Sequence, residues 1–286
     1  MIAVVGPGAV GGLLAWLLHR ADANVVAVGR AASVETINSH GIRVISTVYG
    51  DGTEAVPALQ DVTAGASVIL TVKTYGLDDS LKMIAQSRPR DVLSLMNGIG
   101  HEQVLSRQLA GVPVAAGSIA VEASRSADGT IEHKSPFVRI AVPSSSSEFA
   151  SVRALGGTAA ELTIGGTDDE VLWRKFRFLA PMALLTSYWQ TSLGDALTKD
   201  AALTQSVLAE VVACEVADGV PDTVESVAAV LSTFPQTMHS SLQADLAAGR
   251  PSELDSIGGE LLRRAKRHNI AMPAVEKIVA ALSQDR

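Results

Sequence analysis

Short apolar runs alternate with stretches of helical periodicity over the first part of the chain. The run Ile2–Val5 is followed by apolar residues at helical spacing, and a second run, Val25–Val28, comes next. The helical positions are Val10, Leu13, Leu14, Leu17 and Leu18. Apolar residues three or four positions apart mark a helix that buries one face, and short continuous apolar runs mark buried strands. This segment therefore predicts a β-α-β unit.

The alternation continues to about Gly165-Gly166, beyond which strand patterns stop and long helical patterns follow. Further strands are predicted at Ser67–Val72, Val92–Leu95, Val114–Val121, Val138–Val142 and Glu161–Ile164. Helices are predicted at Thr204–Asp218 and Leu254–Arg267. Alternation followed by helices favours a doubly wound, mostly parallel α/β domain over residues 1–165 and an all-α domain over residues 166–286.

A glycine-rich turn separates the first strand from the first helix. Its sequence is Gly6-Pro7-Gly8-Ala9-Val10-Gly11. In the G-x-G-x-x-G pattern the first glycine makes a tight turn, the second lets a pyrophosphate approach the backbone, and the third lets the helix lie close to the sheet. The helix N-terminus then offers N–H groups to the phosphates. The alternative is a glycine turn without a ligand, but the β-α-β context favours a dinucleotide-binding Rossmann domain.

The end of the second strand indicates which dinucleotide is bound. An acidic residue there would bind the ribose hydroxyls of NAD and repel the 2′-phosphate of NADP. The strand instead ends Val28-Gly29-Arg30, and no acidic residue follows until Glu35. The guanidinium of Arg30 has a planar fork of donors that suits a phosphate. We therefore expect NADP(H), with an exposed loop arginine as the alternative interpretation.

Length, charge and cysteine content limit the class of protein. The 286 residues favour two domains, and 47% hydrophobic against 19% charged residues is typical of a globular chain. A formal net charge of −7 argues against a nucleic-acid partner. No stretch predicts a membrane span, and a single cysteine, Cys214, agrees with a reducing compartment. The sequence therefore predicts a cytoplasmic protein without a membrane partner.

Two polar residues come directly after predicted strands. Lys73 follows Ser67–Val72, and Asn97 follows Val92–Leu95 after one further residue. Ligands of open α/β sheets bind beyond the carboxyl ends of the strands, so both should border the cofactor crevice. The alternatives are a solvated lysine and a common Asn-Gly turn.

Carbonyl reduction by a nicotinamide cofactor needs a donor aimed at the carbonyl oxygen, where negative charge grows. The six histidines are scattered along the sequence, and no spacing typical of a metal site occurs. Lysines and carboxylates of the helical half remain as candidates. Elementary chemistry does not choose among them.

The chain resembles the ketopantoate reductase (2-dehydropantoate 2-reductase) family over nearly its whole length. The resemblance covers the glycine turn, Arg30, Thr71–Thr74, Asn97–Gly100, Leu172–Lys175 and, most specifically, Ser240–Asp255. It continues into Gly259, Arg263, Arg264 and Pro273. It implies that NADPH reduces the 2-keto group of ketopantoate to give pantoate, a step of pantothenate biosynthesis. By analogy, it also implies a homodimer.

The resemblance assigns roles to particular residues. Lys175 matches the catalytic lysine, and Glu253 matches the acid at the substrate hydroxyl. Asn97 and Ser241 match substrate-contacting positions, while Lys73 matches a residue near the nicotinamide. From their chemistry alone, both residues have another interpretation. Lys175 could be an ordinary helix lysine that buries the aliphatic part of its side chain, and Glu253 a first-turn acid that stabilises a helix dipole.

The chain departs from the family pattern at two positions. The family places asparagines four and eight residues after the catalytic lysine, where this chain has Leu179 and Ala183. An apolar wall hydrogen-bonds no hydroxyl, so the substrate could be a less polar 2-oxo acid. A non-catalytic NADP(H)-binding regulator is the rival from another class. An opine-type or 3-hydroxyacid dehydrogenase is a third reading, against which Gly249–Glu253 argues.

Overall fold

The computed structural model describes residues 1–284 and divides into two compact units. The first unit holds Met1–Met96 and Gly100–Val171, and the second holds Asn97–Ile99 together with the chain from Leu172. The division therefore falls inside helix α6 (Asp168–Trp189), a few residues beyond the boundary expected at Gly165-Gly166.

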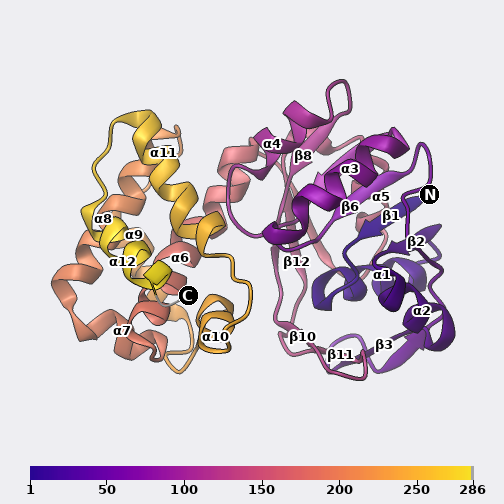
Figure 1. Ribbon diagram of the computed structural model, residues 1–286, viewed down its shortest axis with the longest axis horizontal. Helices are drawn as coiled ribbons and strands as arrows, with labels where there is room; N and C mark the ends of the chain where they lie inside the picture. Colours follow the sequence, from indigo (N-terminus) through magenta and orange to yellow (C-terminus); the bar gives the residue numbers. More distant parts are fainter. Residues whose placement is uncertain (285–286) are drawn as a thin grey trace. The chain divides into compact units, whose positions relative to one another are not determined.

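A parallel six-stranded sheet forms the centre of the first unit (Figure 1). Its order is β5 (Ala58–Leu59), β2 (Val25–Val28), β1 (Ile2–Val5), β6 (Ser67–Leu70), β7 (Asp91–Ser94) and β8 (Val114–Ala116). Every pair of neighbours is parallel. The chain order of the strands reverses between β1 and β6, so the sheet is doubly wound with its switch point there. The fold class predicted from the sequence is confirmed.

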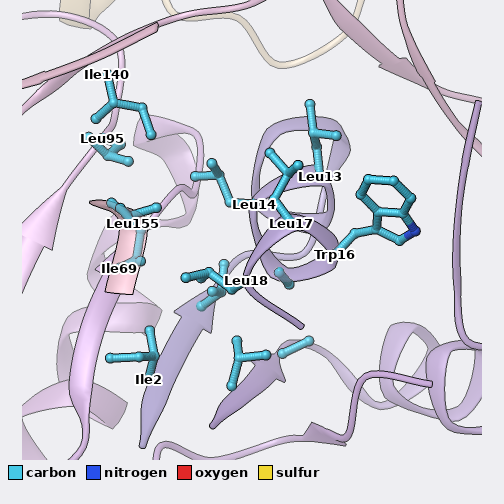
Figure 2. Close-up of a cluster of buried hydrophobic side chains, with 14 of the residues drawn as sticks. Ile2, Leu13, Leu14, Trp16, Leu17, Leu18, Ile69, Leu95, Ile140 and Leu155 are labelled. Atoms are coloured by element: carbon cyan, nitrogen blue, oxygen red, sulfur yellow. The ribbon is translucent and has the colours of Figure 1, made fainter. Parts of the chain in front are cut away.

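Alternate side chains of each strand enter different cores, because successive residues of a strand point to opposite faces. Ile2 and Val4 pack on the side of α1 (Ala9–Arg20) and α5 (Ala150–Gly156), whereas Ala3 and Val5 pack on the side of α3 (Leu77–Ser87) and α4 (His101–Gln108). Figure 2 shows the first of these cores, a cluster that includes Leu13, Leu14, Leu17 and Leu18 of α1 together with Ile2 and Ile69 of the sheet. Each such buried side chain stabilises the fold by about 1.5–3 kcal/mol.

Two smaller sheets complete the first unit, and one predicted strand was wrong. One sheet has four strands in the order β10 (Ala123–Arg125), β11 (Ile131–His133), β3 (Ile42–Ser46) and β4 (Gly52–Glu54). The other has three strands in the order β13 (Glu161–Ile164), β12 (Arg139–Val142) and β9 (Ser118–Ala120). The run Val114–Val121 is two strands, because it breaks at Gly117 and passes from the central sheet to the third. A Cβ at Gly117 would lie 2.8 Å from Leu95 Cδ2 and 2.9 Å from the Ala141 oxygen, so the crossing needs glycine.

The second unit is helical. Its helices after α6 are α7 (Leu193–Lys199), α8 (Ala201–Ala217), α9 (Val224–Thr233), α10 (Ser241–Ala247), α11 (Glu260–His268) and α12 (Pro273–Gln284). The predicted helix Leu254–Arg267 begins as a π-helical turn, η3 (Asp255–Gly259), before α11 continues it. Among residues 1–284, no helix has the length and apolar character needed to cross a membrane.

Candidate active site

The glycine turn of the first unit has the geometry that its sequence predicts. Gly6 has φ +90°, and a Cβ there would lie 2.7 Å from Val72 Cγ1. A Cβ at Gly11 would lie 2.3 Å from both the Gly6 oxygen and Thr71 Oγ1, so α1 approaches the turn more closely than any larger residue allows. At Gly8 a Cβ would meet nothing nearer than 4.0 Å, which leaves the backbone open. The turn fits a pyrophosphate on both counts.

Arg30 and Lys73 both lie at the carboxyl-terminal edge of the central sheet. Arg30 is the exposed N-cap residue of α2 (Ala31–His40), just beyond β2, and its side chain forms no hydrogen bond or ion pair with the residues described. Lys73 is also exposed and precedes the short 3₁₀ turn η1 (Thr74–Gly76) after β6. Thr71 fixes the β6 end to the glycine turn, because its hydroxyl donates to the Val5 and Gly6 carbonyls at 2.9 and 3.0 Å.

Three polar side chains meet in the second unit. Lys175 Nζ on α6 donates to Asn97 Oδ1 at 2.9 Å, and Asn97 Nδ2 donates to Glu253 Oε2 at 3.1 Å. Glu253 is buried, whereas Lys175 and Asn97 are partly buried. The three residues are far apart in the sequence, so their meeting is a property of the fold. We call them the Lys-Asn-Glu cluster.

Burial lowers the pKa of Lys175 from 10.5 to about 8, although the negative charge of Glu253 opposes the shift. An ammonium with such a pKa is both charged at neutral pH and able to give up its proton. The Asn97 amide orients the lysine through its oxygen, and its N–H donates to the Glu253 carboxylate, which needs donors when it is buried. The cluster can therefore supply a proton to a carbonyl oxygen.

A tight backbone contact holds the Asn97 segment on the π-helical turn. Gly98 has φ +94°, and a Cβ there would lie 2.8 Å from the Ser256 carbonyl oxygen. The Ser256 hydroxyl in turn donates to the Glu253 carbonyl at 3.0 Å. Such π-helical turns occur often at functional sites. Here the turn places Glu253 and the Asn97 segment against each other.

Two family models match the chain. "Ketopantoate reductase PanE/ApbA" covers residues 2–146, and "Ketopantoate reductase PanE/ApbA C terminal" covers residues 169–285. The chain belongs to the ketopantoate reductase family. It is 30% identical to a 2-dehydropantoate 2-reductase of Caulobacter vibrioides, over 99% of this chain and 98% of the relative. Members of this family are NAD(P)H-dependent oxidoreductases.

Solved structures agree with this assignment. A PanE/ApbA family ketopantoate reductase from Ralstonia eutropha has a TM-score of 0.88 at 26% identity, covering 100% of this chain and 98% of that one. A D-mandelate dehydrogenase, solved with NADH and anilino(oxo)acetate, has a TM-score of 0.86 at 19% identity, with 100% and 98% coverage. The second likeness shows a shared fold.

One residue that the resemblance assigned to the substrate site, Ser241, forms no hydrogen bond with the Lys-Asn-Glu cluster. Ser241 is the exposed first residue of α10, and its side chain forms no hydrogen bond with the residues described. Its neighbour Ser240 caps α10 by accepting from the Gln243 backbone N–H at 3.1 Å, and the Thr186 hydroxyl of α6 donates to it at 2.8 Å. Ser240 was not singled out from the sequence, although a serine before an apolar helix is a capping signal.

The two positions that depart from the ketopantoate reductase pattern lie along α6 beyond Lys175. Leu179 is partly buried and packs against a cluster that includes Met182 and Leu208, while Ala183 is 1% exposed. Neither side chain carries a hydrogen-bonding group. The helix that presents Lys175 is therefore apolar at both positions.

Sequence reasoning missed a charged network on the other side of α6. Trp173 Nε1 and His268 Nε2 each lie 2.8 Å from an oxygen of Asp218, which also accepts from Arg264. Arg177 pairs with Asp222 and lies 3.3 Å from Glu215. Burial raises the pKa of Glu215 to about 7 despite the charge of Arg177. Since Trp173 and Arg177 flank Lys175, this network fixes the helix that carries it.

Proposed function

We propose that this protein uses NADPH to reduce a 2-oxo acid, with 2-dehydropantoate as the default substrate and pantoate as the product. The observation that carries the proposal is the Lys-Asn-Glu cluster, in which a partly buried lysine with a pKa of about 8 is hydrogen-bonded to an amide that also binds a buried carboxylate. Membership of the ketopantoate reductase family supports the reaction class.

The first unit has the groups to hold the cofactor. Gly6–Gly11 would take the pyrophosphate, because Gly8 leaves the backbone open. The exposed guanidinium of Arg30 would bind the 2′-phosphate, which favours NADPH over NADH. Lys73, also exposed, would lie near the nicotinamide end. The cofactor supplies the hydride.

The cluster residues take separate roles in the proposal. Lys175 holds a proton on Nζ, hydrogen-bonds the keto oxygen and gives it that proton as negative charge develops. Asn97 orients the ammonium and contacts the substrate. Glu253 binds a substrate hydroxyl, and Ser241 contacts the substrate from the start of α10. A homodimer stays a prediction of the family resemblance.

Absorbance of NADPH at saturating cofactor tests the proposal with a panel of 2-oxo acids: 2-dehydropantoate, 2-oxoisovalerate and phenylglyoxylate. We expect turnover of at least one of them. If calorimetry shows NADPH binding but no acid is turned over, the non-catalytic regulator is correct. Replacing NADPH by NADH in the same assay measures the contribution of the 2′-phosphate.

A less polar 2-oxo acid is the second candidate substrate. Leu179 and Ala183 favour it, because neither can bind a substrate hydroxyl. An apolar wall discriminates by only about 1–3 kcal/mol per methylene, so the preference should be graded. A higher kcat/KM for 2-oxoisovalerate than for 2-dehydropantoate would select this candidate. Leu179→Asn should then shift the preference toward 2-dehydropantoate.

The pH dependence of both reaction directions follows from the pKa of Lys175. Reduction needs the ammonium, so kcat should fall above a pH of about 8, where Lys175 loses its proton. Oxidation of the 2-hydroxy acid by NADP⁺ needs the neutral amine, so its rate should rise through the same pH. Steady-state rates in both directions from pH 6 to 10 measure this. Profiles that move in the same direction would contradict the role of Lys175.

The contact between Gly98 and Ser256 predicts the effect of a single methyl group. Gly98→Ala should lower kcat on the order of tenfold to a hundredfold, because the Asn97 segment must move away from the Ser256 carbonyl. Gly111→Ala is the matched control, since Gly111 has φ +84° but nothing within 4 Å of a Cβ. Both variants carry the backbone strain, and only Gly98→Ala carries the collision. Equal kcat values in the two variants would show that the contact does not position Asn97.

A further inference from the structure

A pocket of about 300 Å³ lies in the first unit beside the glycine turn. Its walls come from Pro7 and Gly12, the second half of α2, the start of β3, β4 and the β10–β11 hairpin. These elements lie together in Figure 1 around α1. The proposed reaction uses none of the side chains that the pocket adds to the glycine turn.

Two arginines and a histidine line this pocket, and neither arginine forms an ion pair with a residue of the described chain. The Arg43 side chain forms no hydrogen bond or ion pair with any residue of the described chain. Arg125 donates one N–H to the Pro7 carbonyl at 3.1 Å and has no ion-pair partner among residues 1–284. His40 adds an imidazole, which makes one contact of 3.3 Å with the Thr36 carbonyl.

Asp128, an acid that lines the pocket, already accepts hydrogen bonds from residues of its own hairpin. Its Oδ1 accepts from the Ser126 hydroxyl and, at 3.1 Å, from the Thr130 backbone N–H, while its Oδ2 accepts from the Thr130 hydroxyl at 3.1 Å. These contacts turn the carboxylate back on the loop. The guanidinium groups of Arg43 and Arg125 therefore keep donors for a ligand.

We propose that this pocket binds a small organic phosphate at a site separate from that of the dinucleotide. Guanidinium forks match the oxygens of a phosphate monoester, and each charge-assisted hydrogen bond is stronger than a neutral one. Pro7, Ile37 and Ile131 supply apolar wall for a short carbon skeleton. The volume lies at the lower end of the range for small-molecule sites and exceeds what inorganic phosphate needs.

The pocket is connected to the cofactor turn through Arg125. Its partner Pro7 lies inside the turn, and a Cβ at Gly29 would be only 2.9 Å from Pro7 Cγ, so Pro7 also packs against Gly29, the residue before Arg30. A phosphate that orders Arg125 would hold Pro7 in place and tighten NADPH binding. Coupling of this kind typically changes affinity by about fivefold or more.

Calorimetry on the full chain tests the site with glycerol 3-phosphate as the probe, with and without saturating NADPH. We expect saturable binding below about 10 mM, weakened at least roughly tenfold by Arg43→Gln. The variant should leave the Kd of NADPH alone unchanged. Arg139→Gln is the control, since Arg139 is an exposed arginine of the same unit that pairs with Glu161. Arg125→Gln should remove the effect of the probe on NADPH affinity.

Three results would overturn the proposal. One is the absence of saturable binding to the unmodified chain, and another is equal probe affinity in Arg43→Gln. The third is competition, in which glycerol 3-phosphate or adenosine 2′-monophosphate displaces NADPH and Arg43→Gln weakens NADPH itself. Competition would assign Arg43 to the 2′-phosphate of the cofactor. Because binding is measured directly, none of these results depends on reductase activity.

Discussion

Lys175→Ala should lower kcat by on the order of a hundredfold or more, with little change in NADPH affinity. The substitution removes the ammonium that the structure hydrogen-bonds to Asn97 at 2.9 Å, and with it the proton proposed for the keto oxygen. Hydride transfer would then create a negative charge with no cation beside it. Single-turnover absorbance of bound NADPH measures the loss directly.

The control for this variant is Lys199→Ala, which removes an exposed lysine of the same unit at the end of α7. It should leave kcat unchanged. The alkaline decline of reduction should also disappear in Lys175→Ala, because the titrating group is gone. A kcat within a few-fold of the unmodified enzyme would remove Lys175 from the mechanism, whatever its position.

The sequence predicts the central sheet well because its signals are local. Ile2–Val5 and Val25–Val28 are strands at the predicted residues, since continuous apolar runs suit strands buried on both faces. The break at Gly117 could not be predicted, because it depends on the approach of Leu95 and Ala141 from elsewhere in the chain. The strands β3, β4, β10 and β11 were not predicted, because they are short and their residues alternate in burial.

The candidate active site could be predicted from local sequence patterns less well than the central sheet. Asn97, Lys175 and Glu253 carry no local pattern that joins them, and only the resemblance to ketopantoate reductases grouped them. The structure then adds what resemblance does not contain: the direct hydrogen bonds and the lowered pKa of Lys175. The network around Asp218 could not be predicted from the sequence, because its partners come from different helices, each with an ordinary helical pattern.

Asp218→Ala should lower the free energy of unfolding of the helical unit by about 3–5 kcal/mol, because it removes one partner of a buried ion pair. The side chains of Asp218 and Arg264 are 8% and 3% exposed, so the remaining guanidinium is poorly hydrated. Trp173 would also lose its 2.8 Å hydrogen bond. Asp195→Ala is the matched control, because exposed Asp195 accepts from Thr191 and Ser192 and should cost less than about 1 kcal/mol.

Urea titration followed by tryptophan fluorescence measures the difference in unfolding free energy. A Trp16→Phe background is used so that the signal comes from Trp173 and Trp189 of the helical unit.

The loss of stability in Asp218→Ala should also depend on pH. Burial raises the pKa of Asp218, but the hydrogen bond and charge of Arg264 outweigh it and hold the pKa below the ordinary 3.8. The stabilisation is therefore complete above the unfolded pKa and lost as the pH falls through the folded one. The difference in unfolding free energy between the unmodified chain and Asp218→Ala should therefore become smaller in acid. A difference that stays the same below the folded-state pKa of Asp218 would show that packing, and not the ion pair, accounts for the loss of stability.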